Sequence, residues 1–187
     1  MFPDIVTIAK GLGGGYAPIG AVMIRSTIAD AIRDGSGAFM HGHTYNGHPL
    51  ACAAAMAVQE VIRDEGLLDN VRSSGTYLQD QLAARLAGNS CVGDVRGRGL
   101  FVGVEFVSDR DKKTPFAPEI KFHSLVRRAA LARGMAIYNM GGTVDGRLGD
   151  HLLVAPAYSV GKAEVDMIVD RLGTAIEAAQ QEVAAHA

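Results

Sequence analysis

Near its start the chain has a lysine between an apolar, β-branched segment and a run of glycines, an arrangement that few local structures accommodate. Residues 4–9 (DIVTIA) have the composition of a strand, and Lys10 and the glycine-rich residues 11–15 (GLGGG) follow directly. Residues 19–25 form a second apolar segment, which we expect to be a buried strand. Glycines tolerate a tight turn and let a ligand approach the backbone closely. The segment therefore predicts a strand, a glycine turn that begins at a lysine, and a return strand.

Three interpretations of Lys10 follow from the residues alone. Lysine is usually exposed, so the simplest is a solvated charge at a strand end. Nucleotide-binding loops fit poorly, because the lysine of a P-loop follows its glycines, and a GxGxxG motif would need glycine where this chain has Tyr16. The third interpretation is a lysine that forms a Schiff base with an aldehyde, a reaction typical of an amine in a partly desolvated site.

The residues around Lys10 resemble a known family. Residues 3–6 (PDIV), 7–15 (TIAKGLGGG) and 18–22 (PIGAV) are similar to the cofactor-lysine segment of class III, or ω-type, aminotransferases. The resemblance implies the cofactor pyridoxal 5'-phosphate (PLP), with Lys10 carrying it as a Schiff base and moving a proton between substrate and cofactor. It also implies an α/β fold: the C-terminal part of the aspartate-aminotransferase-like fold (fold type I), with the end of the large domain and an α+β small domain.

A second polar loop, residues 41–49 (HGHTYNGHP), holds three of the six histidines. It precedes an alanine-rich segment, residues 50–64, that predicts a helix with Pro49 in its first turn. The Asn-Gly pair within the loop is typical of a turn. The spacing of the three histidines matches no standard zinc motif, so we expect no metal.

The same loop is similar to the H-T-Y/F-x-G-x-P motif that precedes a long helix in class III aminotransferases. In that family the threonine contacts the cofactor phosphate of the partner subunit, so the resemblance assigns cofactor binding to Thr44 as well as to Lys10. A hydroxyl and loop amides suit a phosphate dianion. The implied assembly is a homodimer with shared active sites.

From Cys91 onward the chain changes to short strands and covering helices. Residues 92–105 resemble the strand pair that opens the small domain of the family, and residues 134–160 resemble the strand–loop–strand at its active-site entrance. We therefore expect two domains, residues 1–88 from the large domain, with the cofactor lysine, and residues 89–187 as the small domain.

The arginines leave the substrate undefined. Arg96 and Arg98 lie at an expected turn, where a structural or surface role is the simpler interpretation. Many class III members have a carboxylate-binding arginine in the strand where this chain has residues 137–140 (IYNM), and the nearest candidate is Arg147.

Charge and apolar content exclude several other classes. The 18 basic and 20 acidic residues give a formal net charge of −2, so neither nucleic acid nor a membrane surface is an expected partner. A hydrophobic content of 48% excludes a disordered chain. The chain shows no apolar run long enough for a bilayer span, no signal-peptide pattern and only two cysteines. These observations predict a cytoplasmic protein.

Class III members are much longer than this chain, and their upstream part carries the acidic partner of the cofactor ring and the main phosphate loop. The resemblance therefore implies a C-terminal portion, for which a missing N-terminal half is an expected partner. The implied activity is transfer of an amino group from an amino-acid or amine donor to a keto acid or aldehyde. Two alternatives stay open: a non-catalytic remnant or dimerisation module, and a PLP-dependent aminomutase or decarboxylase.

Overall fold

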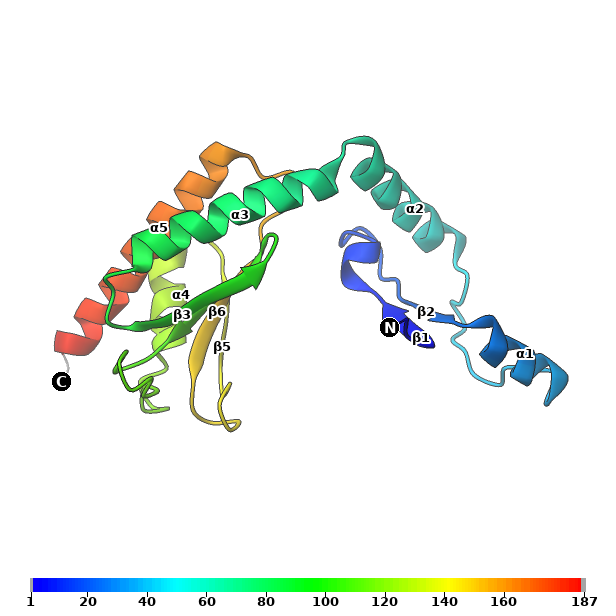
Figure 1. Ribbon diagram of the computed structural model, residues 1–187, viewed down its shortest axis with the longest axis horizontal. Helices are drawn as coiled ribbons and strands as arrows, with labels where there is room; N and C mark the ends of the chain where they lie inside the picture. The colour runs from blue at the N-terminus through cyan, green and yellow to red at the C-terminus, as the bar shows by residue number, and fades with distance from the viewer. Residues whose placement is uncertain (1, 186–187) are drawn as a thin grey trace. The chain divides into compact units, whose positions relative to one another are not determined.

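The computed structural model describes residues 2–185, which form two compact units divided at Gly66 (Figure 1). Gly66 adopts a left-handed backbone with φ of 62°, a conformation that ends one helix before the next begins. The expected domains differ from these units in the place of one helix, α3 (Leu67–Leu86), which packs with the second unit. The predicted boundary between residues 88 and 89 refers to the large and small domains of the longer family protein, and it stays a prediction.

The first unit is built on a two-stranded ribbon. Strands β1 (Ile5–Ile8) and β2 (Ala21–Ile24) pair antiparallel, with Ile5 opposite Ile24 and Ile8 opposite Ala21. A single 3-10 turn, η1 (Lys10–Leu12), begins directly after β1. Two helices complete the unit, α1 (Ser26–Asp34) and α2 (Pro49–Asp64). The strand, turn and return strand expected from the sequence are therefore present.

The first unit buries very little of its apolar surface. Among residues 2–66, only Gly13 and Ala55 are buried. The expectation that the second strand is buried is wrong, because all four residues of β2 are exposed. A ribbon of two strands has little surface of its own to bury, and no helix of this unit shields β2. The apolar composition of β2 correctly predicted a strand, but it did not show whether any surface covers that strand.

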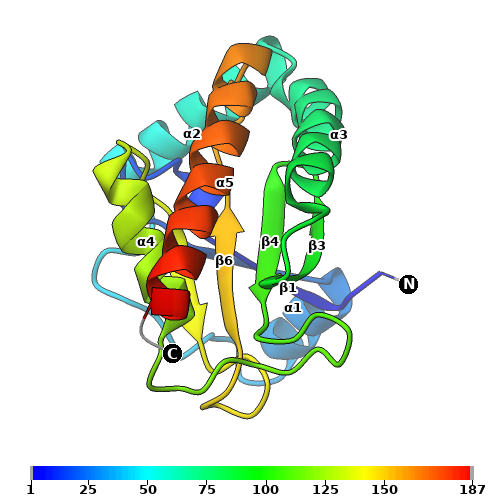
Figure 2. The ribbon, with the colours of Figure 1, turned by 90° about the vertical axis from the view of Figure 1, so that its left-hand side faces the viewer.

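The second unit is a four-stranded antiparallel sheet with three helices on one face (Figure 2). The strands run in the order β3-β4-β6-β5, and β4 and β6 are central. Its elements after α3 are β3 (Val92–Arg98), β4 (Phe101–Phe106), α4 (Phe122–Ala132), β5 (Tyr138–Gly141), β6 (Asp150–Val154) and α5 (Lys162–Ala185).

The core of the second unit lies between the sheet and its helices. Val102, Val104 and Phe106 alternate along β4 and are buried, as their period of two predicts. They meet Leu78 and Leu82 of α3 and apolar residues of α5. Each fully buried side chain of this size contributes about 1.5–3 kcal/mol to folding. This unit therefore has the core that the first unit lacks.

Candidate functional site

Lys10 lies where β1 ends and η1 begins, and it has a left-handed backbone with φ of 51°. Such a backbone is strained for a residue with a side chain. Within residues 2–185, the only other non-glycine residues with positive φ are Lys113 and Lys121, which lie in a turn and at the N-cap of α4. Lys10 alone of the three lies just after a strand, two residues beyond the end of β1, and it is the only lysine in residues 1–111. It is also exposed.

The glycines after Lys10 have two different roles. A Cβ at Gly13 would come within 2.9 Å of both the carbonyl oxygen of Ala17 and the side chain of Ile19, so glycine is required there for close packing. Around Gly11 and Gly15, in contrast, no heavy atom lies within 4 Å of where a Cβ would be. The turn is therefore closely packed at Gly13 and open to solvent at Gly11 and Gly15.

Thr44 lies in the exposed loop that leads into α2. The loop is held by local hydrogen bonds: the backbone N–H of Asn46 donates to the carbonyl of His43 at 3.0 Å, and that of His48 donates to Tyr45 at 3.1 Å. His48 is the N-cap of α2, and its Nδ1 accepts a hydrogen bond from the backbone N–H of Ala51 at 3.4 Å. The Asn-Gly turn and the helix start expected from the sequence are thus both present.

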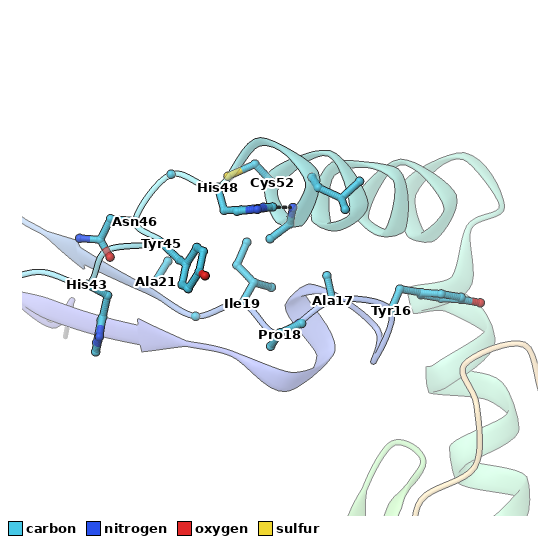
Figure 3. Close-up of a pocket in the computed structure, with 14 residues that line it drawn as sticks. Tyr16, Ala17, Pro18, Ile19, Ala21, His43, Tyr45, Asn46, His48 and Cys52 are labelled. Carbon is cyan, nitrogen blue, oxygen red and sulfur yellow. Dashed lines mark hydrogen bonds between the residues drawn. The ribbon is translucent and has the colours of Figure 1, made fainter.

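A groove of about 830 Å³ lies between residues 16–21 and residues 43–52 (Figure 3). Figure 3 shows the side chains of Tyr45 and Ile19 beside this space, with His48 and Cys52 at the first turn of α2. Neither Lys10 nor Thr44 is among the residues that line the groove. One subunit therefore does not place its two expected cofactor-binding residues in a single pocket.

The histidines of this loop make aromatic contacts with one another and with their neighbours. The rings of Phe39 and His41 are 6.0 Å apart and those of His41 and His43 are 6.3 Å apart, both edge to face. In the part of the chain that the structure describes, no three histidine, cysteine or acidic side chains are grouped so that they could hold a metal ion.

The arginines of the second unit differ in their surroundings. Arg96 forms ion pairs with Glu105 at 2.7 Å and with Asp94 at 2.8 Å, and these two hydrogen-bonded carboxylates raise its pKa. Arg147 lies in the exposed loop between β5 and β6. There the carboxylate of Asp145 accepts hydrogen bonds from the backbone N–H groups of Leu148 and Arg147, which lower the pKa of Asp145. Arg96 is thus occupied by structural contacts, as expected.

The structure also brings together polar residues that no sequence pattern indicates. The Nδ1 atom of His123 lies 2.6 Å from the side-chain nitrogen of Asn139, and its Nε2 lies 3.6 Å from the carboxylate of Asp150. The adjacent His151 has a buried Nδ1 with no hydrogen-bond partner among the described residues. These residues come from α4, β5 and β6, so only the pairing of the strands could have indicated the cluster.

Comparison with known proteins identifies the class to which this fold and lysine segment belong. An (S)-enantioselective ω-transaminase from Thermomicrobium roseum matches 96% of this chain with 36% identity and a TM-score of 0.86, over 38% of its own length. An amine transaminase from an uncultivated Pseudomonas species, in its PLP-bound (internal aldimine) form, matches 95% of this chain with 34% identity and a TM-score of 0.81, over 38% of its length. The fold is therefore that of the fold type I transaminases, as expected.

The family follows from the sequence match. Residues 1–176 match the family described as aminotransferase class-III, and the chain belongs to this family. An aminotransferase from Gibberella zeae is 45% identical over 93% of this chain and 34% of its own length. The chain thus spans about a third of the length of such curated relatives. No helix within residues 2–185 is both long and apolar enough to cross a membrane.

Proposed function

We propose that this chain is the part of a PLP-dependent aminotransferase that supplies the cofactor lysine, Lys10, and a phosphate-binding threonine, Thr44. The observation that carries the proposal is the backbone of Lys10: an exposed lysine in a strained left-handed conformation, between a strand end and an open glycine turn. Strained conformations cluster at functional sites because the surrounding structure must maintain them. Family membership supplies the chemistry that fits this arrangement.

The residues present fit the cofactor. PLP, when bound, supplies an aldehyde and an electron-withdrawing ring that stabilises a carbanion next to the substrate nitrogen. An amine is the group that reacts reversibly with an aldehyde, and Lys10 is the only one on a side chain in the first unit. The open space beside Gly11 and Gly15 leaves room for the ring.

Lys10 would have two roles in the reaction. Its Nζ would hold the cofactor through the aldehyde while no donor is bound, and would be free as an amine when the donor occupies the site. The free Lys10 amine would act as the general base that takes a proton from the substrate Cα and as the acid that returns it. The position of Nζ decides which proton can be moved, so the turn that carries Lys10 must be held firmly.

Thr44 would donate a hydrogen bond from its hydroxyl to the phosphate bound by the partner subunit. Its exposure, and its absence from the groove of its own chain, support a contact with a second subunit. A homodimer with shared sites follows, with an amino-acid or amine donor and a keto-acid or aldehyde acceptor.

In the longer family protein, residues 1–88 would belong to the large domain and residues 89–187 to the small domain. We infer a cytoplasmic location from the sequence signals alone.

Covalent trapping tests the proposal directly. The chain is incubated with PLP, reduced with borohydride and digested, and the modified lysines are quantified by mass spectrometry. We expect Lys10 to be modified well ahead of Lys113 and Lys121, which share its left-handed backbone and serve as matched references. Lys10→Ala should abolish the fast-reacting fraction, whereas Lys121→Ala should leave it unchanged. Equal modification of all three lysines would contradict the proposal.

The exposure of the first unit favours a second candidate role, as a non-catalytic association module of a transaminase. Twelve large apolar side chains of residues 2–66 are exposed, which is typical of a surface that another polypeptide covers. This role predicts self-association with no preferred modification of Lys10. Light scattering combined with the trapping experiment therefore distinguishes the two candidates.

A further inference from the structure

The turn that carries Lys10 is tied to helix α2 by one side chain. The Nε2 atom of Gln59 donates a hydrogen bond to the carbonyl oxygen of Leu12 at 3.1 Å. Leu12 is the last residue of η1, two residues after Lys10, and lies 47 residues before Gln59. Figure 1 shows this turn beside α2 within the first unit.

The other carbonyl groups of the turn are paired locally. Those of Ala9, Lys10 and Gly11 accept the backbone N–H groups three residues later, at 3.1, 3.2 and 3.4 Å. The carbonyl of Gly13 accepts the N–H of Tyr16 at 2.9 Å. Leu12 is the exception in this series, since its carbonyl accepts from Gln59. For the residues that the structure describes, this is the only hydrogen bond that joins residues 10–14 to another element.

Packing at the preceding residue of α2, Val58, reinforces this contact. Gly14 has a φ of 57°, and a Cβ there would lie 3.2 Å from Cγ2 of Val58. The turn therefore approaches α2 closely enough that Val58 packs against it while Gln59 bonds to it. A short 3-10 turn has poor hydrogen-bond geometry of its own, so the contacts from α2 add to its rigidity.

We propose that Gln59 is a positioning residue for Lys10: it fixes the turn η1 against α2 and so sets where the Lys10 amine points. This inference rests on the proposed function of Lys10 as the cofactor lysine. Lys10 precedes the bonded carbonyl by two residues in a single helical turn, so a shift of Leu12 rotates the backbone of Lys10 as well. Loss of the donor therefore changes the reactivity of an amine that Gln59 does not itself contact.

The test measures trapping of PLP on Lys10 relative to Lys113 in the same molecules, by borohydride reduction and mass spectrometry. Gln59→Leu removes the donor, and we expect the ratio of Lys10 to Lys113 to fall about fivefold, the factor that corresponds to one ordinary hydrogen bond. Gln59→Arg keeps an N–H donor with sufficient reach and should restore the ratio to within about twofold. Glu60→Gln changes the neighbouring exposed residue of α2 and should have no effect.

The outcomes separate the two proposals. A wild-type chain in which Lys10 reacts no faster than Lys113 overturns the proposed function, and this inference with it. A wild-type preference for Lys10 that persists in Gln59→Leu overturns only the role of Gln59. Hydrogen exchange of residues 9–16 supplies the second readout. Faster amide exchange in Gln59→Leu, and exchange at the wild-type rate in Gln59→Arg, support the role of Gln59 in holding the turn. An equal loss of the ratio in Gln59→Leu and Gln59→Arg contradicts a role for the donor.

Discussion

The carboxylate of Asp150 accepts a hydrogen bond from the backbone N–H of His123 at 3.1 Å, and the same oxygen lies 3.6 Å from Nε2 of that histidine. Asp150 begins β6 and His123 lies in the first turn of α4, so the pair joins the sheet to the helix that covers it. Asp150 is only 4% exposed. A buried carboxylate is tolerated because free N–H groups at a helix N-terminus pair with it.

Replacing Asp150 should therefore destabilise the second unit. Asp150→Ala leaves the N–H of His123 without its partner inside the protein, and we expect the free energy of unfolding to fall by about 1–3 kcal/mol. Urea denaturation followed by circular dichroism measures this change. Asp80→Ala, at an exposed position of α3, is the control and should stay within about 0.5 kcal/mol of wild type. A similar loss in both variants would argue against a specific role for Asp150.

The stability of the same region should depend on pH through His151. Burial, followed by the positive charges of His123 and Arg96, lowers the pKa of His151 below its ordinary value of 6.5. The unfolded chain then takes up this proton at a higher pH than the folded chain does. The free energy of unfolding should therefore decrease as the pH falls below about 6.5.

The change His151→Gln isolates this contribution, because glutamine does not titrate. We expect the variant to lose less stability than wild type between about pH 7.5 and about pH 5.5 in urea denaturation series. Parallel curves for the two proteins would show that other groups cause the acid sensitivity.

A glycine contact fixes how closely α3 approaches the β3–β4 turn. A Cβ added at Gly75 would lie 2.6 Å from the Cα of Gly99, far inside van der Waals contact. Gly75→Ala should force the helix and turn apart and lower the free energy of unfolding by about 1–3 kcal/mol. Gly88→Ala is a matched control, since no atom lies within 4 Å of the new methyl group and its φ is not positive. Equal stability of the two variants would show that the turn shifts freely.

Much of the fold could be predicted from local patterns. The alternation along β4, the helix at residues 50–64 and the turn after Lys10 all depend on neighbouring residues, and the structure confirms them. Residues 135–138 (MAIY) have the apolar composition of a strand, but the strand lies instead at Tyr138–Gly141. Its polar and glycine residues have weak strand propensity, and pairing with β6, where Tyr138 faces Leu153, sets its position.

Parts of the candidate site could not be predicted because they depend on contacts distant in sequence. The periodicity of α2 does not show that Gln59 faces the carbonyl of Leu12. The composition of β2 predicts a strand but does not show whether another polypeptide covers it. Lys10 and Thr44 were found through long motifs that resemble a family, which supply roles that spacing alone does not contain.

The difference in burial between the two units should appear in hydrogen exchange. Helix α2 has a single buried residue, Ala55, whereas α3 buries Leu78, Leu82 and Leu86. Local opening is easiest where few apolar contacts are lost, so amides of α2 should exchange at least about tenfold faster than those of α3. Mass spectrometry of the intact chain compares both helices in one sample. If α2 and α3 are equally protected at high protein concentration and α2 loses this protection on dilution, a second copy of the chain covers the exposed face of α2. Equal protection of the two helices at every concentration would contradict the prediction.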